Sequence, residues 1–352
     1  MKTIFPESKP WIIAGPCSAE SEEQVLAAAS ALGRQGISVF RAGIWKPRTH
    51  PGCFEGVGEK GLEWLRRVQK EYGMKVCTEV AGAAHVEACL KAGVDMLWIG
   101  ARTTANPFLV QEIAESLRGV NIPVLVKNPI NPDLDLWIGA IERFCRQGVT
   151  DLGVVHRGFS SFEKIKYRNA PHWQYAIEMR SAFPDLPFFC DPSHMAGTTE
   201  YIKEISQRAL DLGLDGLMIE SHCHPEIALS DSAQQLTPKS LEDMLRSLSV
   251  RRSRSEDAAF NEILSRYRER IDAVDEALVR LLGERMEISR EIGRSKKESN
   301  VAIIQTSRWD EVMEAAEKLG SAYGLEADFV KKIFNIIHDA SAAEQNKIIS
   351  EL

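Results

Sequence analysis

The chain has 352 residues, of which 44% are hydrophobic and 26% charged, and its formal net charge is -7. This is the composition of an ordinary folded protein, and the negative charge argues against a general nucleic-acid-binding protein. No segment reaches the roughly 18 consecutive apolar residues of a membrane helix, and residues 1–10 lack a signal-peptide core, so we expect a cytoplasmic protein without membrane contact.

A short pattern repeats along the first two thirds of the chain: a helical stretch ends at a glycine and an apolar strand follows. Glycine is the usual residue just past the end of a helix, so each repeat predicts a helix and then a strand. The glycines are Gly36, Gly73, Gly93, Gly119, Gly148 and Gly213. With strands at residues 11–15 and 187–191, the pattern gives eight strands, ending near residues 15, 43, 79, 99, 127, 156, 191 and 220.

Eight strands alternating with helices predict a closed (β/α)8 barrel, or TIM barrel, over residues 1–248. An open doubly wound sheet is the alternative. That fold usually has a glycine-rich nucleotide turn after its first strand, whereas here the turn reads Gly15-Pro-Cys-Ser18. The predicted fold class is therefore α/β, with a linker at residues 249–258 and an all-α domain at residues 259–352.

Three strand ends carry donors that suit a metal ion. Cys17 follows the first strand, His194 the seventh, and Glu220 ends the eighth, with Asp231 in the next loop. Barrel closure makes these strands neighbours at the C-terminal face, where barrel enzymes place their active sites. A thiolate, an imidazole and two carboxylates suit Mn, Fe, Co or Zn better than Mg. We therefore expect one divalent metal per barrel.

Two further histidines, His222 and His224, compete for the same role. Side chains alternate along a strand, so Ser221 points outward if Glu220 points into the mouth, and the histidines are predicted to support the ligands or to lie in the loop. Taken alone, Cys17 could equally be a core thiol and His194 an ordinary loop histidine.

The other strand ends carry positive charge. Several cations aimed into one concave mouth of an acidic protein repel one another unless anions bind there, so the pattern predicts a site for phosphorylated or carboxylated substrates. Arginine offers a bidentate fork to such groups and lysine a point charge. The cations are Arg41, Lys46, Arg48, Arg102, Lys127 and Arg157.

Several motifs of residues 11 to about 245 resemble those of 3-deoxy-D-arabino-heptulosonate 7-phosphate (DAHP) synthases of the short, barrel-only subclass. In order, they are Gly-Pro-Cys-Ser, Arg-x-Gly-x-x-Lys-Pro-Arg-Thr, Ile-Gly-Ala-Arg, Asp-Pro-Ser-His and Ile-Glu-Ser-His. The resemblance implies condensation of phosphoenolpyruvate with erythrose 4-phosphate. It assigns the metal to Cys17, His194, Glu220 and Asp231, phosphoenolpyruvate to Arg41, Lys46, Arg102, Lys127 and Arg157, and erythrose 4-phosphate to Arg48 and Thr49.

Two alternatives for the barrel remain. The synthases of an eight-carbon sugar acid share the fold, but their corresponding loop tends to read Lys-Ala-Asn-Arg-Ser rather than Lys-Pro-Arg-Thr. A metal-dependent hydrolase could use the same four ligands, but it would not need the cations at the other strand ends. Lys46 and Lys127 are expected to take part in the chemistry, and either Lys46 or a metal-bound water could handle the proton of the attacking water.

Beyond the linker, apolar residues recur at spacings of three and four from Ile263 to Ile292, without a proline. This spacing predicts a long amphipathic helix, and two shorter helices are expected at residues 308–319 and 325–349. A segment of about 95 residues built on so long a helix can hardly close its own core, so we expect a homodimer through this domain.

Cations on the predicted long helix suggest a second site. Arg285 and Lys296 share one face about 16 Å apart, and two long cations at that distance can bracket a small dianion. Arg268 lies about 25 Å from Arg285 along the helix, which is too far for the same site in one chain but suits the partner's site in a dimer. A solvated face rich in Glu and Arg is the alternative.

From about Ile263 to Gln345 the chain resembles the all-helical chorismate mutases, through the spacing of Arg268, Arg285, Lys296, Arg308, Ser341 and Gln345. The resemblance implies rearrangement of chorismate to prephenate without covalent catalysis. Arg285 and Arg308 would bind carboxylates, Lys296 and Gln345 the ether oxygen, and Arg268 would come from the partner subunit. Gln305 stands where an aspartate often contacts the substrate hydroxyl.

The fusion of the two domains suggests regulation, because DAHP lies several steps before chorismate and channelling between the sites makes little sense. We expect the mutase domain to bind prephenate or chorismate and to inhibit the barrel, so that deletion of residues 250–352 abolishes the inhibition. The alternative is a catalytically silent module for binding and dimerisation.

Overall fold

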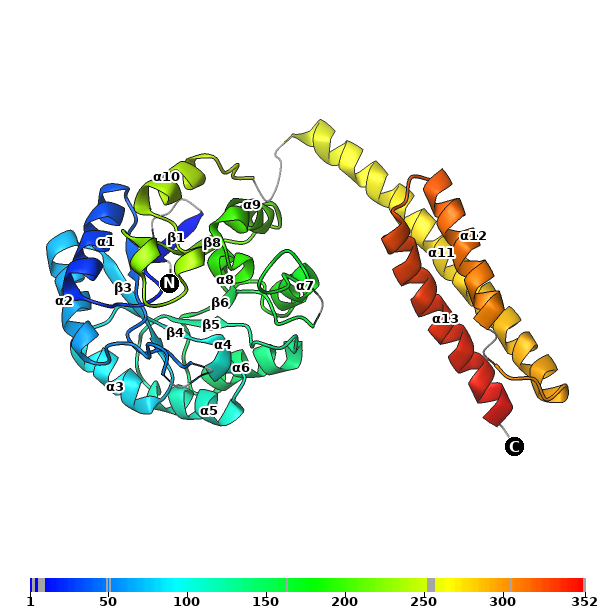
Figure 1. Cartoon of the computed structure of the whole chain (residues 1–352), viewed down its shortest axis with the longest axis horizontal. Helices are drawn as coiled ribbons and strands as arrows, with labels where there is room; N and C mark the ends of the chain where they lie inside the picture. The colour runs from blue at the N-terminus through cyan, green and yellow to red at the C-terminus, as the bar shows by residue number, and fades with distance from the viewer. Residues whose placement is uncertain are drawn as a thin grey trace. The chain divides into compact units, whose positions relative to one another are not determined.

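The computed structural model describes residues 1, 4–5, 10–48, 50, 52–162, 164–251, 257–303 and 306–350. It divides into two compact units, Met1–Ser253 and Arg254–Leu352, which we describe separately (Figure 1). Helix α11 begins at Ala258, the last residue of the predicted linker. Within the described part of the chain, no helix is long and apolar enough to cross a membrane.

The first unit is a closed barrel of eight parallel strands in sequential order, and β1 pairs with β8 to complete it. The predicted (β/α)8 barrel is thus confirmed, and the open sheet is ruled out. Its register places Gly15 beside Glu220, which brings the ends of the first and last strands together. The strands are β1 (Trp11–Gly15), β2 (Val39–Arg41), β3 (Lys75–Val80), β4 (Met96–Ile99), β5 (Val124–Lys127), β6 (Leu152–His156), β7 (Phe188–Cys190) and β8 (Gly216–Glu220).

Helices surround this barrel (Figure 1). The six glycines predicted to follow helices all have positive φ, between 66° and 82°, which explains why glycine stands there. Side chains cap several helix starts; Ser21, for example, accepts a hydrogen bond from the backbone N–H of Gln24. The helices are α1 (Glu22–Arg34), α2 (Lys60–Tyr72), α3 (Ala83–Ala92), α4 (Ala101–Thr104), α5 (Pro107–Ser116), α6 (Leu134–Arg146), α7 (Trp173–Ala182), α8 (Pro192–Ala196), α9 (Ile202–Asp211) and α10 (Pro238–Arg246), with 3-10 turns η1 (Thr199–Tyr201), η2 (Pro225–Ile227) and η3 (Ser232–Gln234).

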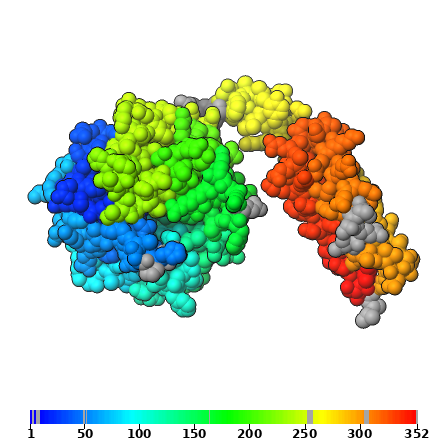
Figure 2. All heavy atoms as spheres, viewed as in Figure 1, coloured from blue at the N-terminus to red at the C-terminus, as the bar shows by residue number. Residues whose placement is uncertain are grey.

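Two apolar layers hold the barrel. The larger lies between strands and helices, and the smaller fills the interior with side chains such as Trp11, Met96, Trp98 and Phe189. Side chains and loops therefore fill the ring that the ribbon leaves open (Figure 2). Because the interior is packed, the polar groups at the C-terminal strand ends lie on an apolar floor.

The second unit has three helices, as predicted: α11 (Ala258–Glu298), α12 (Thr306–Ala322) and α13 (Ala327–Ser350). α13 packs along α11 and α12 packs against α13. α13 lies beside the C-terminal part of α11, whose N-terminal turns extend beyond it (Figure 1). Several apolar side chains of α11 are at least half exposed, among them Ile263, Tyr267, Ile271, Val274, Leu278 and Leu281.

Candidate active sites

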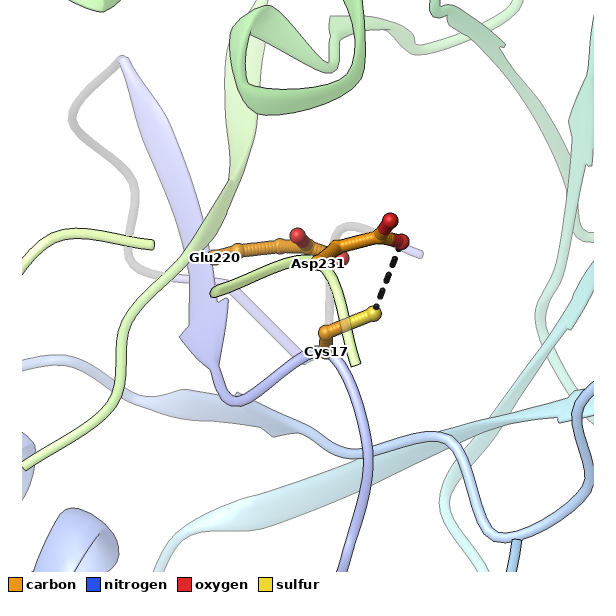
Figure 3. Close-up of side chains that lie close together, drawn as sticks. All are labelled: Cys17, Glu220 and Asp231. Carbon is orange, nitrogen blue, oxygen red and sulfur yellow. Dashed lines mark hydrogen bonds between the residues drawn. The ribbon is translucent and has the colours of Figure 1, made fainter. Parts of the chain in front are cut away.

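Three of the predicted metal ligands meet at the mouth of the barrel. The donor atoms of Cys17, Glu220 and Asp231 all lie within 4.8 Å of one another, and Cys17 Sγ is 3.4 Å from Asp231 Oδ2. Figure 3 shows Cys17 on the turn after β1, pointing toward Asp231. We call these residues the three-donor cluster.

His194 lies beside the three-donor cluster, on α8. Its Nε2 is 3.7 Å from Glu220 Oε1, and its Nδ1 is 2.8 Å from Asp191 Oδ2. A carboxylate at one ring nitrogen fixes the orientation of an imidazole and leaves the other nitrogen for a ligand. Asp191 therefore aims Nε2 of His194 toward the cluster.

The charges of the cluster favour a bound cation. Burial, together with the nearby carboxylates of Glu220 and Asp231, raises the pKa of the Cys17 thiol to about 12, although Lys46 opposes this effect. Burial would also raise the pKa of both carboxyl groups, but nearby His194 and cations hold them below their usual values. The ionised carboxylates of Glu220 and Asp231 therefore lie close to the Cys17 thiol. Loss of the thiol proton would add a third negative charge, which a bound cation would stabilise. This set of donors fits a divalent metal that accepts sulfur, nitrogen and oxygen.

The two competing histidines lie outside the cluster. His222 is buried, its Nδ1 accepts a hydrogen bond from the backbone N–H of His224, and its Nε2 is 3.9 Å from Glu20. His224 is exposed and lies near Glu226. Both belong to the loop after β8.

The predicted cations gather around one cavity of about 280 Å³ at the same face. Burial lowers the pKa of Arg157 to about 10, and the cations Arg168 and Arg102 add to this effect while Asp191 opposes it. Such crowding of positive charge is relieved when an anion binds. The cations that line the cavity are Lys46, Arg48, Arg102, Lys127, Arg157 and Arg168.

Arg41 has a different place from the other cations. Its side chain is fully buried, and Nη2 donates a hydrogen bond to Glu220 Oε1 at 3.0 Å. Among the described residues that line the cavity, Arg41 is not included. Its contact with Glu220 makes it a support for the three-donor cluster. Thr49, predicted for erythrose 4-phosphate, lies outside the described residues.

Two glycines of the sequence motifs make room for functional side chains. A Cβ on Gly43 would lie 2.8 Å from Lys46 Cε, where Lys46 Nζ reaches Cys17 Sγ at 3.1 Å. A Cβ on Gly100 would lie 2.0 Å from Glu79 Oε1. Neither position can carry a larger residue without displacing the neighbouring charged group.

Sequence reasoning missed several polar groups of this site. Glu79 lines the cavity and accepts a hydrogen bond from Trp98 Nε1. Its place near the C-terminal end of β3, where barrel enzymes carry their active sites, could have identified it. Asp191 contacts Lys127 Nζ at 2.6 Å, and its place beside His194 could likewise have identified it. Arg168 and Asn169 also line the cavity, but they lie in a long loop with no motif to single them out.

His156, at the end of β6, should make the barrel sensitive to acid. Burial lowers its pKa from 6.5 to about 3, and its Nε2 donates to the carbonyl of Pro171. Below pH 6.5 His156 takes up a proton in the unfolded chain but not in the folded chain. The free energy of unfolding therefore decreases as the pH is lowered. We expect this group to cost about 1.4 kcal/mol per pH unit between pH 6 and 4. Urea unfolding of wild type and His156→Gln should show that slope reduced in the variant; equal slopes would contradict it.

The helical unit brings together a second set of predicted residues. Arg285 on α11 donates to Ser341 Oγ on α13, and burial lowers the pKa of Arg285. Gln345 is 9% exposed, and its Oε1 has no hydrogen-bond partner among the residues that the structure describes. A Cβ on Gly293 would lie 3.1 Å from Gln345 Cα, so this glycine permits the close approach of the two helices. An unpaired buried acceptor among such groups suits a ligand.

The remaining predicted residues of this unit are more dispersed. Lys296 Nζ donates to the carbonyl of Ile303 at 2.5 Å. Arg308 forms an exposed pair with Glu311 on its own helix, and Arg268 is exposed on the N-terminal half of α11. Gln305 lies outside the described residues.

Similarities to known proteins cover both units. The protein-family model described as "DAHP synthetase I family" matches residues 5–254. The protein-family model described as "Chorismate mutase type II" matches residues 267–346. A phospho-2-dehydro-3-deoxyheptonate aldolase of Thermotoga maritima is 36% identical over 225 residues, which are 64% of this chain and 64% of that protein. The match thus spans less than two thirds of this relative.

Two further similarities concern the barrel. A 2-dehydro-3-deoxyphosphooctonate aldolase of Wolinella succinogenes is 29% identical over 269 residues, which are 67% of this chain and 97% of that protein. The crystal structure of phospho-2-dehydro-3-deoxyheptonate aldolase (DAHP synthase) from Thermotoga maritima aligns with a TM-score of 0.61 and 34% identity, over 67% of each chain.

Proposed function

Because the chain belongs to the DAHP synthetase I family and carries a chorismate mutase type II domain after its barrel, we propose that it is a bifunctional enzyme of the shikimate pathway. The barrel condenses phosphoenolpyruvate with erythrose 4-phosphate, giving DAHP and phosphate. The helical domain rearranges chorismate to prephenate. The observation that carries the first activity is the cationic cavity beside the three-donor cluster.

In the barrel, the three-donor cluster and His194 would hold one divalent metal, with Mn, Fe, Co and Zn as candidates. When bound, such a metal supplies Lewis-acid polarisation of the aldehyde. Arg102, Lys127 and Arg157 hold the phosphate and carboxylate of phosphoenolpyruvate, and Arg48 holds erythrose 4-phosphate. These cations orient two anions that would otherwise repel each other.

The methylene carbon of phosphoenolpyruvate attacks the aldehyde carbon, water adds to the neighbouring carbon, and phosphate leaves. The cations that bind the substrate also stabilise negative charge on the departing phosphate. Asp191 holds Lys127 through their 2.6 Å contact. Lys46, with Nζ at 3.1 Å from Cys17 Sγ, is placed between the cluster and the cavity to move a proton.

The choice of aldehyde distinguishes this proposal from synthesis of an eight-carbon sugar acid. We propose the seven-carbon product because the loop after β2 reads Lys-Pro-Arg-Thr. Mass spectrometry of reactions with phosphoenolpyruvate and either erythrose 4-phosphate or arabinose 5-phosphate tests this choice. The seven-carbon acid should form much faster from erythrose 4-phosphate than the eight-carbon acid forms from arabinose 5-phosphate. Preferential use of arabinose 5-phosphate would refute the assignment.

In the helical domain, Arg285 binds a carboxylate of chorismate, and Lys296 and Gln345 hydrogen-bond the ether oxygen as its bond to carbon breaks. Ser341 holds Arg285 in place through their hydrogen bond, and Arg308 binds the second carboxylate. The reaction is unimolecular, so a compact bound conformer and charge stabilisation are sufficient.

We also propose that the helical domain forms a homodimer. Several apolar side chains of α11 between Ile263 and Leu281 are at least half exposed in one chain. Such a stripe favours burial against a partner, and a second copy of α11 has the matching periodicity. The dimer would bring Arg268 of the partner subunit to the site of Arg285.

Inhibition of the barrel by prephenate or chorismate is a further part of the proposal. A chain ending at Ser253, the boundary of the first unit, should keep DAHP synthesis and lose this inhibition, because the effector site lies in the deleted domain. Rates of phosphate release at increasing prephenate, for both chains in parallel, provide the measurement. A truncated barrel that remained inhibited would contradict the regulatory role.

A further inference from the structure

Two consecutive glutamines lie between β8 and α10, beside the three-donor cluster. Gln234 and Gln235 are 0% and 1% exposed. A primary amide has two donor hydrogens and an acceptor oxygen, and burial is costly unless these find partners. Both amides make hydrogen bonds to the ligands, to the backbone next to them, or to Arg168, which itself binds a ligand.

Gln235 joins the two loops that carry Cys17 and Asp231. Its Oε1 accepts a hydrogen bond from the backbone N–H of Cys17 at 3.0 Å, and its Nε2 donates to the carbonyl of Ser230 at 2.8 Å. These loops come from opposite ends of the barrel sequence. One side chain therefore fixes the separation of the thiol and the carboxylate.

Gln234 acts on the two carboxylates. Its Nε2 donates to Glu220 Oε2 at 2.7 Å, and its Oε1 accepts from Arg168 Nη1 at 2.9 Å. The same Arg168 nitrogen donates to Asp231 Oδ1 at 3.0 Å. One oxygen of each carboxylate, Glu220 Oε2 and Asp231 Oδ1, thus accepts a hydrogen bond from a side chain outside the three-donor cluster. Glu220 Oε1 accepts a hydrogen bond from Arg41 Nη2 at 3.0 Å and lies 3.7 Å from His194 Nε2, and Asp231 Oδ2 lies 3.4 Å from Cys17 Sγ.

The backbone of Asp231 needs this support. Its φ of 46° and ψ of 40° lie in the left-handed region, which residues other than glycine adopt rarely, although Asp and Asn do so more often than most. The loop closes back on β8 through the hydrogen bond from the backbone N–H of Leu236 to the carbonyl of Glu220, at 3.0 Å. Between these anchors, Gln235 holds Ser230, the residue that precedes Asp231.

We propose that Gln234 and Gln235 are positioning residues that set the affinity of the three-donor cluster for its divalent metal. This inference rests on the proposed metal site. It assigns to the two amides the separation of the ligands and the orientation of the Glu220 and Asp231 carboxylates. Groups that hold metal ligands in this way contribute about 10-fold to 100-fold to affinity.

The test is titration of the metal-free full chain with Co²⁺ alone, because a thiolate bound to Co²⁺ gives a charge-transfer absorbance that reports Cys17. Gln234→Met and Gln235→Met keep the size of each side chain and remove its hydrogen bonds. Each should bind Co²⁺ about tenfold or more weakly than wild type. Gln235→Glu keeps an acceptor for the backbone N–H of Cys17, so it should bind Co²⁺ more tightly than Gln235→Met and more weakly than wild type. If Gln235→Met does not fold, Gln235→Glu replaces it in the comparison with wild type.

Gln69→Met is the matched control. Gln69 Nε2 donates to Gly93 O and Asp95 Oδ2, away from the site, so this variant should bind Co²⁺ like wild type. If the glutamines only stabilise the fold, the Met variants will unfold at a lower temperature and bind Co²⁺ with unchanged affinity. This result would overturn the role of the two glutamines but not the metal site. A wild type that binds no Co²⁺ through sulfur overturns the metal site itself.

Discussion

Replacement of Cys17 by alanine should reduce DAHP synthesis at least about 100-fold and leave chorismate rearrangement unchanged. The thiol is one of the three donors that lie within 4.8 Å of one another, and alanine offers no donor atom. Both rates can be measured on one preparation, by phosphate release and by loss of chorismate absorbance. The mutase rate then verifies that the helical unit is intact, and a thermal unfolding curve checks that the barrel is folded.

Cys89→Ala is the matched control for this variant. Cys89 is also a fully buried thiol, but it packs in the apolar layer on α3. Its loss should cost stability of about 1 kcal/mol and little activity. If Cys17→Ala behaved like Cys89→Ala, Cys17 would be an ordinary core thiol and the metal site would be wrong.

Replacement of Arg285 by alanine should lower chorismate rearrangement by about 100-fold to 1,000-fold, with DAHP synthesis in the absence of effector unaffected. Arg285 is partly buried between α11 and α13, where its charge is poorly screened and is held by Ser341. Arg280→Ala removes an exposed arginine of the same helix that pairs with Glu284, and it should keep the wild-type rate. Equal rates in both variants, or no mutase activity in wild type, would favour a silent binding module.

The shared site of the proposed dimer can be tested by mixing two inactive variants. If Arg268 serves the partner's site, a mixed dimer of Arg268→Ala and Arg285→Ala chains contains one site with both arginines intact. Mutase activity should therefore reappear when the variants are mixed and allowed to exchange subunits. Activity that stays absent, although sedimentation detects mixed dimers, would show that Arg268 does not act across the interface.

The barrel could be predicted because its signals are local. Six described helices of the barrel that precede a strand are followed within three residues by a glycine with positive φ, such as Gly73 or Gly213, and the strands that come next are mostly apolar. Closure of eight strands then fixes which strand ends are neighbours. This is why Cys17 and Glu220, more than 200 residues apart, could be placed together from the sequence.

The details of the site depend on side-chain direction and loop shape, which have no local signal. Arg41 ends a strand as Lys127 does, but its side chain turns inward and donates a hydrogen bond to Glu220. Asp231 adopts a left-handed conformation that no motif in the sequence announces. Gln234 and Arg168 reach the ligands from loops whose paths are set only by the folded barrel.

The most direct measurement for the barrel is release of phosphate from phosphoenolpyruvate by the metal-loaded full chain, with and without erythrose 4-phosphate. We expect release to require erythrose 4-phosphate and to match the DAHP formed, because the bond to phosphate breaks only after the two substrates join. Phosphate release at the same rate from phosphoenolpyruvate alone would instead identify a hydrolase and contradict the proposed condensation.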